Sequence, residues 1–168
     1  MLNTRLEVEL NKQLNAELYS AYLYLSMSAY LASKNLSGFS NWMKVQFEEE
    51  QFHALKLYNY IIDRGGKVTL TAIEAPKTEW NDILDVFEDV LAHEEKVTGL
   101  INELVNVSME EKDHATVSIL QWFVTEQVEE EATVSDLLDQ LKLVEGKGSG
   151  LFILDREAKQ RVFTPPAE

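Results

Sequence analysis

The chain has 168 residues, no cysteine and a formal net charge of -14. This length fits a single domain with a substantial core, and the lack of cysteine excludes disulfides, thiolate zinc sites and iron–sulfur ligation. The acidic balance argues against nucleic-acid binding, which needs a basic surface, and it favours cations as partners. The first residues show no signal-peptide pattern and no apolar run could span a membrane, so we expect a cytoplasmic protein without a membrane partner.

The first half of the chain predicts two long amphipathic helices, at about 3–33 and about 38–64, because apolar residues recur every three or four positions. Only a few residues around Asn35 separate them, which predicts antiparallel neighbours. Polar residues interrupt both apolar faces near the middle. Glu17 does so in the first helix, and Glu50 with His53 alongside does so in the second.

The second half predicts helices at about 79–106 and about 109–145, with a short fifth helix at about 151–162. Thr78 is the expected N-cap of the third helix, and Ser108 is expected to open the fourth in a capping box with Glu111. Glu94 interrupts the apolar face of the third helix, and Gln127 with Glu130 interrupts that of the fourth. Two other histidines, His93 and His114, join no interrupted stripe, and we expect both at the surface.

The connection between the second and third helices decides the topology. The segment from Gly65 to Lys77, with Pro76 near its end, reaches at most ~45 Å when extended. A helix of about 27 residues spans ~40 Å, so this connection can run the full length of the bundle and place the third helix parallel to the second. We therefore predict an all-α, ferritin-like four-helix bundle at about 3–145, with one long crossover and a short fifth helix, in one domain over residues 1–168.

The interrupting side chains fall near the helix midpoints, so a side-by-side bundle should gather them in one layer. An isolated buried carboxylate is very costly, whereas several at one depth make sense around cations. The four glutamates carry four negative charges, which two Fe(II) ions would balance. Glu50-x-x-His53 can present a carboxylate and an imidazole to one metal. Carboxylate and imidazole also suit Mn(II) and Zn(II), so the ligand types alone do not select iron.

With these residues in place, nearly the whole chain resembles the prokaryotic non-haem ferritins. The resemblance rests on Glu17, Tyr24, Glu49-Glu50-x-x-His53, Glu94, Trp122 and Glu126-Gln127-x-Glu129-Glu130. It implies that Glu17, Glu50 and His53 hold one iron. Glu50 would bridge to a second iron, held also by Glu94 and Glu130, with Gln127 as a polar partner and Tyr24 beside the centre. Glu49, Glu126 and Glu129, with Glu130 shared, would form a third iron site.

Two departures separate the chain from the haem-containing bacterioferritins. Those proteins carry a second Glu-x-x-His on the fourth helix, where this chain has Gln127-x-x-Glu130, and a haem-binding methionine where this chain has Gln51. The resemblance therefore implies a haem-free ferritin. It would be a ferroxidase that oxidises Fe(II) with O₂ or H₂O₂ and stores the product as ferric mineral. The implied assembly is a homo-oligomeric shell of twenty-four subunits, with the fifth helix near the fourfold axes.

Other interpretations stay open on the sequence. A soluble di-iron or di-manganese oxidase that stores nothing would use the same ligands, and an acidic shell that only nucleates mineral would need no catalysis. Tyr24 could be an ordinary core residue. Glu49, Glu126 and Glu129 could simply face solvent, and Trp122 is more often a packing residue than a chemical one.

Overall fold

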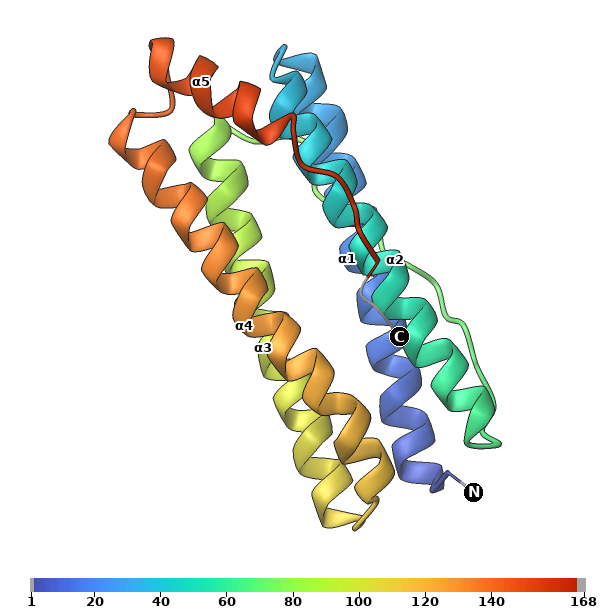
Figure 1. Ribbon diagram of the computed structural model, residues 1–168. Coiled ribbons are helices and arrows are strands. Elements are labelled where there is room, and N and C mark those ends of the chain that lie inside the picture. Colours follow the sequence, from blue (N-terminus) through green and yellow to red (C-terminus); the bar gives the residue numbers. More distant parts are fainter. Residues whose placement is uncertain (1, 166–168) are drawn as a thin grey trace.

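The computed structural model describes residues 2–165, and in this part of the chain it consists of helices joined by turns and one long connection. The helices are α1 (Thr4–Ser33), α2 (Ser37–Asp63), α3 (Ile83–Glu110), α4 (His114–Leu143) and α5 (Gly148–Ala158). Figure 1 shows the four long helices side by side, with α5 across one end of the bundle. The all-α prediction is confirmed. Of the predicted domain, residues 1 and 166–168 lie outside the described part.

The crossover between α2 and α3 follows α1 along its length. Near the start of α1, the Asn11 side chain accepts a hydrogen bond from the Thr69 amide at 2.7 Å. Near its end, the Tyr30 hydroxyl donates to the Trp80 carbonyl at 2.6 Å. The crossover therefore runs parallel to α1, and α3 starts at the same end of the bundle as α2 (Figure 1). The predicted long crossover, with α3 parallel to α2, is confirmed.

The predicted start of the third helix was wrong by about a turn. Asp82, not Thr78, caps α3, and its side chain accepts a hydrogen bond from the Asp85 amide at 3.0 Å. The preceding residues are committed to the crossover, because Trp80 is buried and its indole N–H donates to Asp89 at 2.7 Å. The Tyr30 hydroxyl of α1, 50 positions away, also donates to the Trp80 carbonyl, and this long-range contact outweighs the local helix signal at Thr78.

The predicted capping box at the start of the fourth helix was also wrong. Ser108 lies inside α3, where its hydroxyl donates to the Leu104 carbonyl at 2.7 Å. Asp113 caps α4 instead and accepts from the Thr116 amide at 3.0 Å. The same carboxylate pairs with Arg64, from the end of α2, at 2.7 Å. This ion pair joins the α2 end to the α3–α4 turn.

The fifth helix begins three residues earlier and ends four residues earlier than predicted, at Gly148 and Ala158. It supplies a cap that α2 lacks, because Leu36 offers no side-chain hydrogen bond there. Asp155 of α5 accepts from the backbone amides of Gly38 at 2.9 Å and Phe39 at 3.0 Å. A carboxylate at a helix N-terminus also interacts favourably with the helix dipole. The contact fixes α5 across the end of the bundle.

Two apolar clusters fill the bundle, one on each side of the polar layer. The cluster nearer α5 includes Met27, Phe39 and Phe87, and the other includes Leu14 and Ile101. The predicted apolar faces of α1 and α3 are buried throughout. Small departures occur elsewhere: Phe47 of α2 and Leu137 of α4 are only half-buried, and Leu138 takes the core position beside Leu137. Within residues 2–165, no helix combines the length and apolar character that crossing a membrane requires.

Candidate metal centre

The polar residues predicted to share one layer are all buried. Glu17 and Glu94 are at most 1% exposed, Glu50 and His53 are 3% exposed, and Glu130 is 7% exposed. They come from all four long helices, so the layer exists only because the bundle assembles. Gln127, which is 5% exposed, and Tyr24, which is fully buried, lie in the same region.

Glu17, Glu50 and His53 form the core of the centre. One ligand atom from each lies within 4.8 Å of the other two, which is the spacing of groups that share a cation. The Nδ1 atom of His53 is 3.5 Å from Oε2 of Glu50. That buried Oε2 atom has no hydrogen-bond partner. An unsatisfied buried carboxylate oxygen is costly, and a cation would satisfy it. The residues present therefore fit a metal ion bound by oxygen and nitrogen.

Glu94 and Glu130 are held in the same layer by hydrogen bonds from neutral donors. The Tyr24 hydroxyl donates to Oε1 of Glu94, and the Gln127 amide donates to Oε2 of Glu94 at 3.1 Å. The Gln46 amide donates to Oε2 of Glu130 at 2.9 Å. Neutral donors fix the carboxylates in place without neutralising them. Since none of these donors is positively charged, none of them takes the place of a cation.

Burial and mutual repulsion raise the pKa values of these carboxyl groups. Burial raises the pKa of Glu17 to about 8, with the charge of Glu50 adding to the effect. Burial and the neighbouring Glu130 charge raise the pKa of Glu94 to about 7. The pKa of Glu50 is raised well above its usual value, first by burial and then by the charges of Glu94 and Glu130. Without a cation the centre holds protons, so cation binding must release them.

The three outer glutamates differ from one another. Glu49 and Glu126 are half-buried, whereas Glu129 is exposed. Burial raises the pKa of Glu49 to about 7 although Arg161, 2.6 Å from its Oε2 atom, acts in the opposite direction. Burial also raises the pKa of Glu126. The carboxyl groups of Glu130 and Glu126 both oppose ionisation of Glu49. Among the described residues, only Glu17, Glu50 and His53 bring three ligand atoms within 4.8 Å of one another, so the structure does not draw the outer glutamates together as it does that trio.

Several residues that support the centre were missed at the level of sequence. Gln13 donates a hydrogen bond to Oε1 of Glu17 at 2.9 Å, and Gln46 donates one to Oε2 of Glu130 at 2.9 Å. Both are polar residues on otherwise buried helix faces, which is a signal that could have found them. Arg161 offered no such signal, because its partner Glu49 lies 112 positions away.

The prediction for His93 was wrong, and that for His114 was right. His93 is half-buried, with Nε2 2.8 Å from the Ser20 hydroxyl and its ring edge-on to Tyr24. Burial lowers its pKa to about 4, so the ring is neutral at neutral pH. His93 therefore links α1 to α3 just outside the centre. His114 is exposed at the start of α4.

Trp122 packs directly against the centre. Its ring lies edge-on to the rings of His53 and Phe123, with centroid distances of 5.3 Å and 4.8 Å. Phe52 contacts the same indole at 6.0 Å, and the Lys56 ammonium lies 4.4 Å from its centroid. Trp122 therefore has the packing role that the sequence favoured. This aromatic wall fixes the orientation of the His53 ring.

A crossover four-helix bundle with carboxylates and a histidine in its central layer is a ferritin-like architecture. Comparison with known families matches residues 7–144 to the family described as "Ferritin-like domain". A bacterial non-heme ferritin of Staphylococcus saprophyticus is 42% identical over 163 residues, covering 97% of this chain and 98% of its own. One from Bacteroides fragilis is 42% identical over 161 residues, covering 96% and 100%.

Solved structures give the same answer. An open pore ferritin from the hyperthermophilic archaeon Archaeoglobus fulgidus superposes with a TM-score of 0.95 at 48% identity, covering 96% of this chain and 100% of that one. A form of that ferritin engineered to be closed gives a TM-score of 0.96 at 49% identity, covering 98% and 100%. This chain belongs to the ferritin family.

Proposed function

We propose that this protein is an iron-storage ferroxidase whose substrate, Fe(II), binds in the central polar layer. The observation that carries the proposal is the cluster of Glu17, Glu50 and His53, with its unsatisfied buried Glu50 oxygen, inside a ferritin-family bundle. Glu50 serves as the shared ligand, because its carboxylate lies close to Glu17 and His53. The charges of Glu94 and Glu130 also raise its pKa, so it interacts with both halves of the layer. Four glutamates then balance the charge of two Fe(II) ions.

The protein contributes geometry, charge and proton release, while the iron supplies the electrons. Two Fe(II) ions each give up one electron, and O₂ takes both electrons with two protons to become H₂O₂. Alternatively, H₂O₂ takes both electrons with two protons to become water. Carboxyl groups with raised pKa values lose their protons when cations bind, which puts protons where the reduced oxidant needs them. Tyr24 and Gln127 hold Glu94 in place while the charge at the centre changes.

The proposal extends to storage and assembly. Fe(III) leaves the centre for a ferric mineral inside a homo-oligomeric shell of twenty-four subunits, as in the ferritin architecture. Glu49, Glu126 and Glu129, with Glu130, provide a third iron site next to the centre. Haem takes no part, and the cell compartment is the cytoplasm. The relatives named bacterial non-heme ferritin, at 42% identity over nearly the full length, support this proposal.

The test compares initial rates of Fe(II) oxidation, followed by ferric absorbance, in wild type, His53→Ala and His114→Ala. We expect the variant of the buried His53 to oxidise Fe(II) at least roughly tenfold more slowly. Removing a group that merely orients a metal ligand already lowers activity by about that factor, and removing the ligand itself should lower it at least as much. The exposed His114 variant is the matched control and should keep the wild-type rate. Circular dichroism and assembly size show whether each variant folds.

Two results would favour the alternatives. Equal initial rates in wild type and the His53 variant would favour the interpretation that the protein is an acidic shell that only nucleates mineral. A small oligomer that oxidises Fe(II) but retains no iron after loading would favour the interpretation that the protein is a soluble di-metal oxidase. Iron retained per assembly, measured after gel filtration, separates storage from oxidation alone.

A further inference from the structure

The segment that follows α5 turns back over the bundle and runs along α2 toward the metal centre (Figure 1). Arg161 lies in this segment, where its guanidinium donates a hydrogen bond to Oε2 of Glu49 at 2.6 Å. Glu49 immediately precedes Glu50, the central carboxylate of the trio. The C-terminal segment thus brings a permanent positive charge to the edge of the centre.

Arg161 is held in place by more than its ion pair. Its guanidinium lies 4.4 Å from the ring centroid of Trp42, and its carbonyl accepts a hydrogen bond from the Asn41 side chain at 2.9 Å. Two residues further on, Phe163 contacts the ring of Phe52, with the centroids 6.2 Å apart. These contacts hold the backbone at the ion pair and just after it. The side chains of Arg161 and Glu49 are only 22% and 23% exposed, so water screens the pair weakly.

Glu49 needs a positive partner because its surroundings oppose its negative charge. It is partly buried, and the carboxyl groups of Glu130 and Glu126 repel it. The structure offers the Arg161 guanidinium as that partner. A metal cation bound at Glu49 would meet the guanidinium at the same carboxylate. Two positive charges within hydrogen-bond range of one group repel each other, so the two partners compete.

We propose that Arg161 is a built-in competitor for cations at Glu49, and that a cation binding there displaces the guanidinium and loosens the C-terminal segment. This inference rests on the proposed function, since it assumes that Glu49 contributes to a third cation site. Arg161 then acts as a positioning residue that makes the third site weaker than the central pair. The central sites therefore fill first, and the segment 159–165 reports when the third site fills.

The experiment titrates the assembled, metal-free protein with Zn(II), a redox-inert ion that accepts the same oxygen and nitrogen ligands. Calorimetry gives the affinity of each class of site, and hydrogen–deuterium exchange gives the protection of residues 159–165. We expect Arg161→Gln to raise the affinity of the last-filled site by roughly fivefold, the scale of a partly exposed ion pair. Arg161→Lys, which keeps the charge, should stay near wild type.

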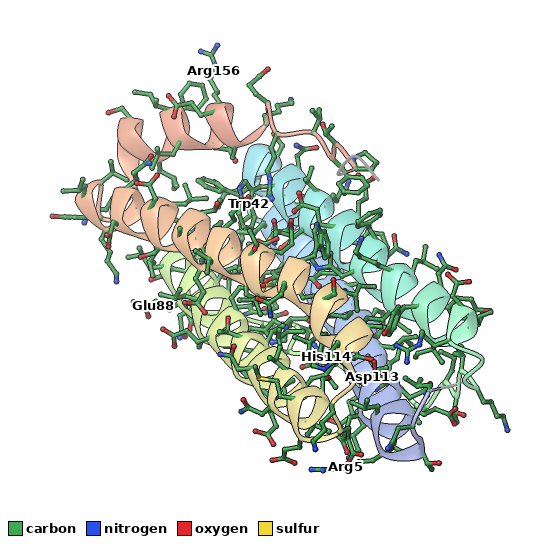
Figure 2. All side chains as sticks on the ribbon, turned by 60° about the horizontal axis from the view of Figure 1, so that its bottom comes forward. Arg5, Trp42, Glu88, Asp113, His114 and Arg156 are labelled. Atoms are coloured by element: carbon green, nitrogen blue, oxygen red, sulfur yellow. The ribbon has the colours of Figure 1, made fainter. Side chains whose placement is uncertain are left out.

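Arg156→Gln is the matched control, because Arg156 projects from α5 away from the bundle (Figure 2). It should change neither Zn(II) affinity nor exchange. In wild type, exchange in residues 159–165 should rise only as the last site fills. In Glu49→Gln it should already be raised without Zn(II), and adding Arg161→Gln to that variant should have no further effect on affinity.

A purely structural role for Arg161 predicts a different result. Arg161→Gln would then loosen residues 159–165 and lower the melting temperature while leaving every Zn(II) affinity unchanged, which would overturn the proposal. The central sites provide the separate check on the proposed function. If they fail to bind Zn(II) in wild type, the metal centre itself is refuted. If they fill normally while the last site ignores Arg161, only the competition is refuted.

Discussion

The buried carboxylates should make the metal-free protein less stable than its packing allows, and Glu17→Gln tests this directly. Glu17 is 1% exposed, and burial raises its pKa from 4.5 to about 8. Between these two values the folded state binds more protons at Glu17 than the unfolded state does. The contribution of Glu17 to the free energy of unfolding is therefore fully present below about pH 4.5, and it is lost as the pH rises toward 8. Glutamine keeps the size of the side chain and removes the titration.

The magnitude follows from the span of pH over which the penalty accumulates. Each pH unit between the unfolded and folded pKa values costs about 1.4 kcal/mol. At pH 7.5 the accumulated penalty is on the order of 4 kcal/mol, whereas at pH 5 it is below ~1 kcal/mol. For a chain of this length, ~1 kcal/mol shifts the melting temperature by roughly 2–4 °C. We therefore expect Glu17→Gln to raise the melting temperature of the metal-free protein by roughly 10 °C at pH 7.5.

Calorimetric melting after chelator treatment, at pH 5 and at pH 7.5, measures the effect. Glu88→Gln, on an exposed part of α3 (Figure 2), is the control and should change little at either pH. Added Zn(II) should reverse the order, because wild type gains binding energy that the Glu17 variant has lost. The reasoning is refuted if Glu17→Gln melts no higher than wild type at pH 7.5, or if its advantage is the same at both pH values.

Two further predictions concern the contacts that hold the bundle ends. Gly38→Ala should free α5, because a Cβ atom at Gly38 would lie 1.5 Å from the Asp155 carbonyl oxygen. Loss of the two capping hydrogen bonds costs about 1–2 kcal/mol, and hydrogen exchange in α5 should rise. Helix propensity alone predicts that alanine raises the melting temperature and leaves the exchange of α5 unchanged, and that result would contradict the prediction. Asp113→Asn keeps the α4 cap and removes the ion pair to Arg64, and should cost roughly 1–3 kcal/mol in denaturant titrations at neutral pH. Because that ion pair lowers the pKa of Asp113 to about 2, the difference from wild type should shrink as the pH falls from about 4 toward 2, and a constant difference would count against it.

The architecture could be predicted from the sequence because it depends on features that lie within each segment. Apolar residues every three or four positions define a helix face regardless of what covers it. Glu17, Glu50, Glu94 and Glu130 stood out as candidates because each interrupts such a face, and the structure buries all four. The long segment before Ile83 set the crossover topology through simple chain reach.

The tertiary structure decided which groups meet across long separations. Local signals favoured Thr78 and Ser108 as helix caps, but Asp82 and Asp113 take these places because the crossover and Arg64 hold the chain differently. The donors to Glu94 and Glu130 likewise come from other helices, as Gln46 does for Glu130.

The ends of the chain show the same division. Asp155 caps α2 from 117 positions away, and Arg161 reaches Glu49 from 112 positions away. A helical period carries no information about such partners, because the free energy of an ion pair or cap depends on a distance that only the folded bundle defines. The sequence by itself determined the helices and their buried acidic layer. Only the packed bundle decided how that layer is held, and which charge meets it at its edge.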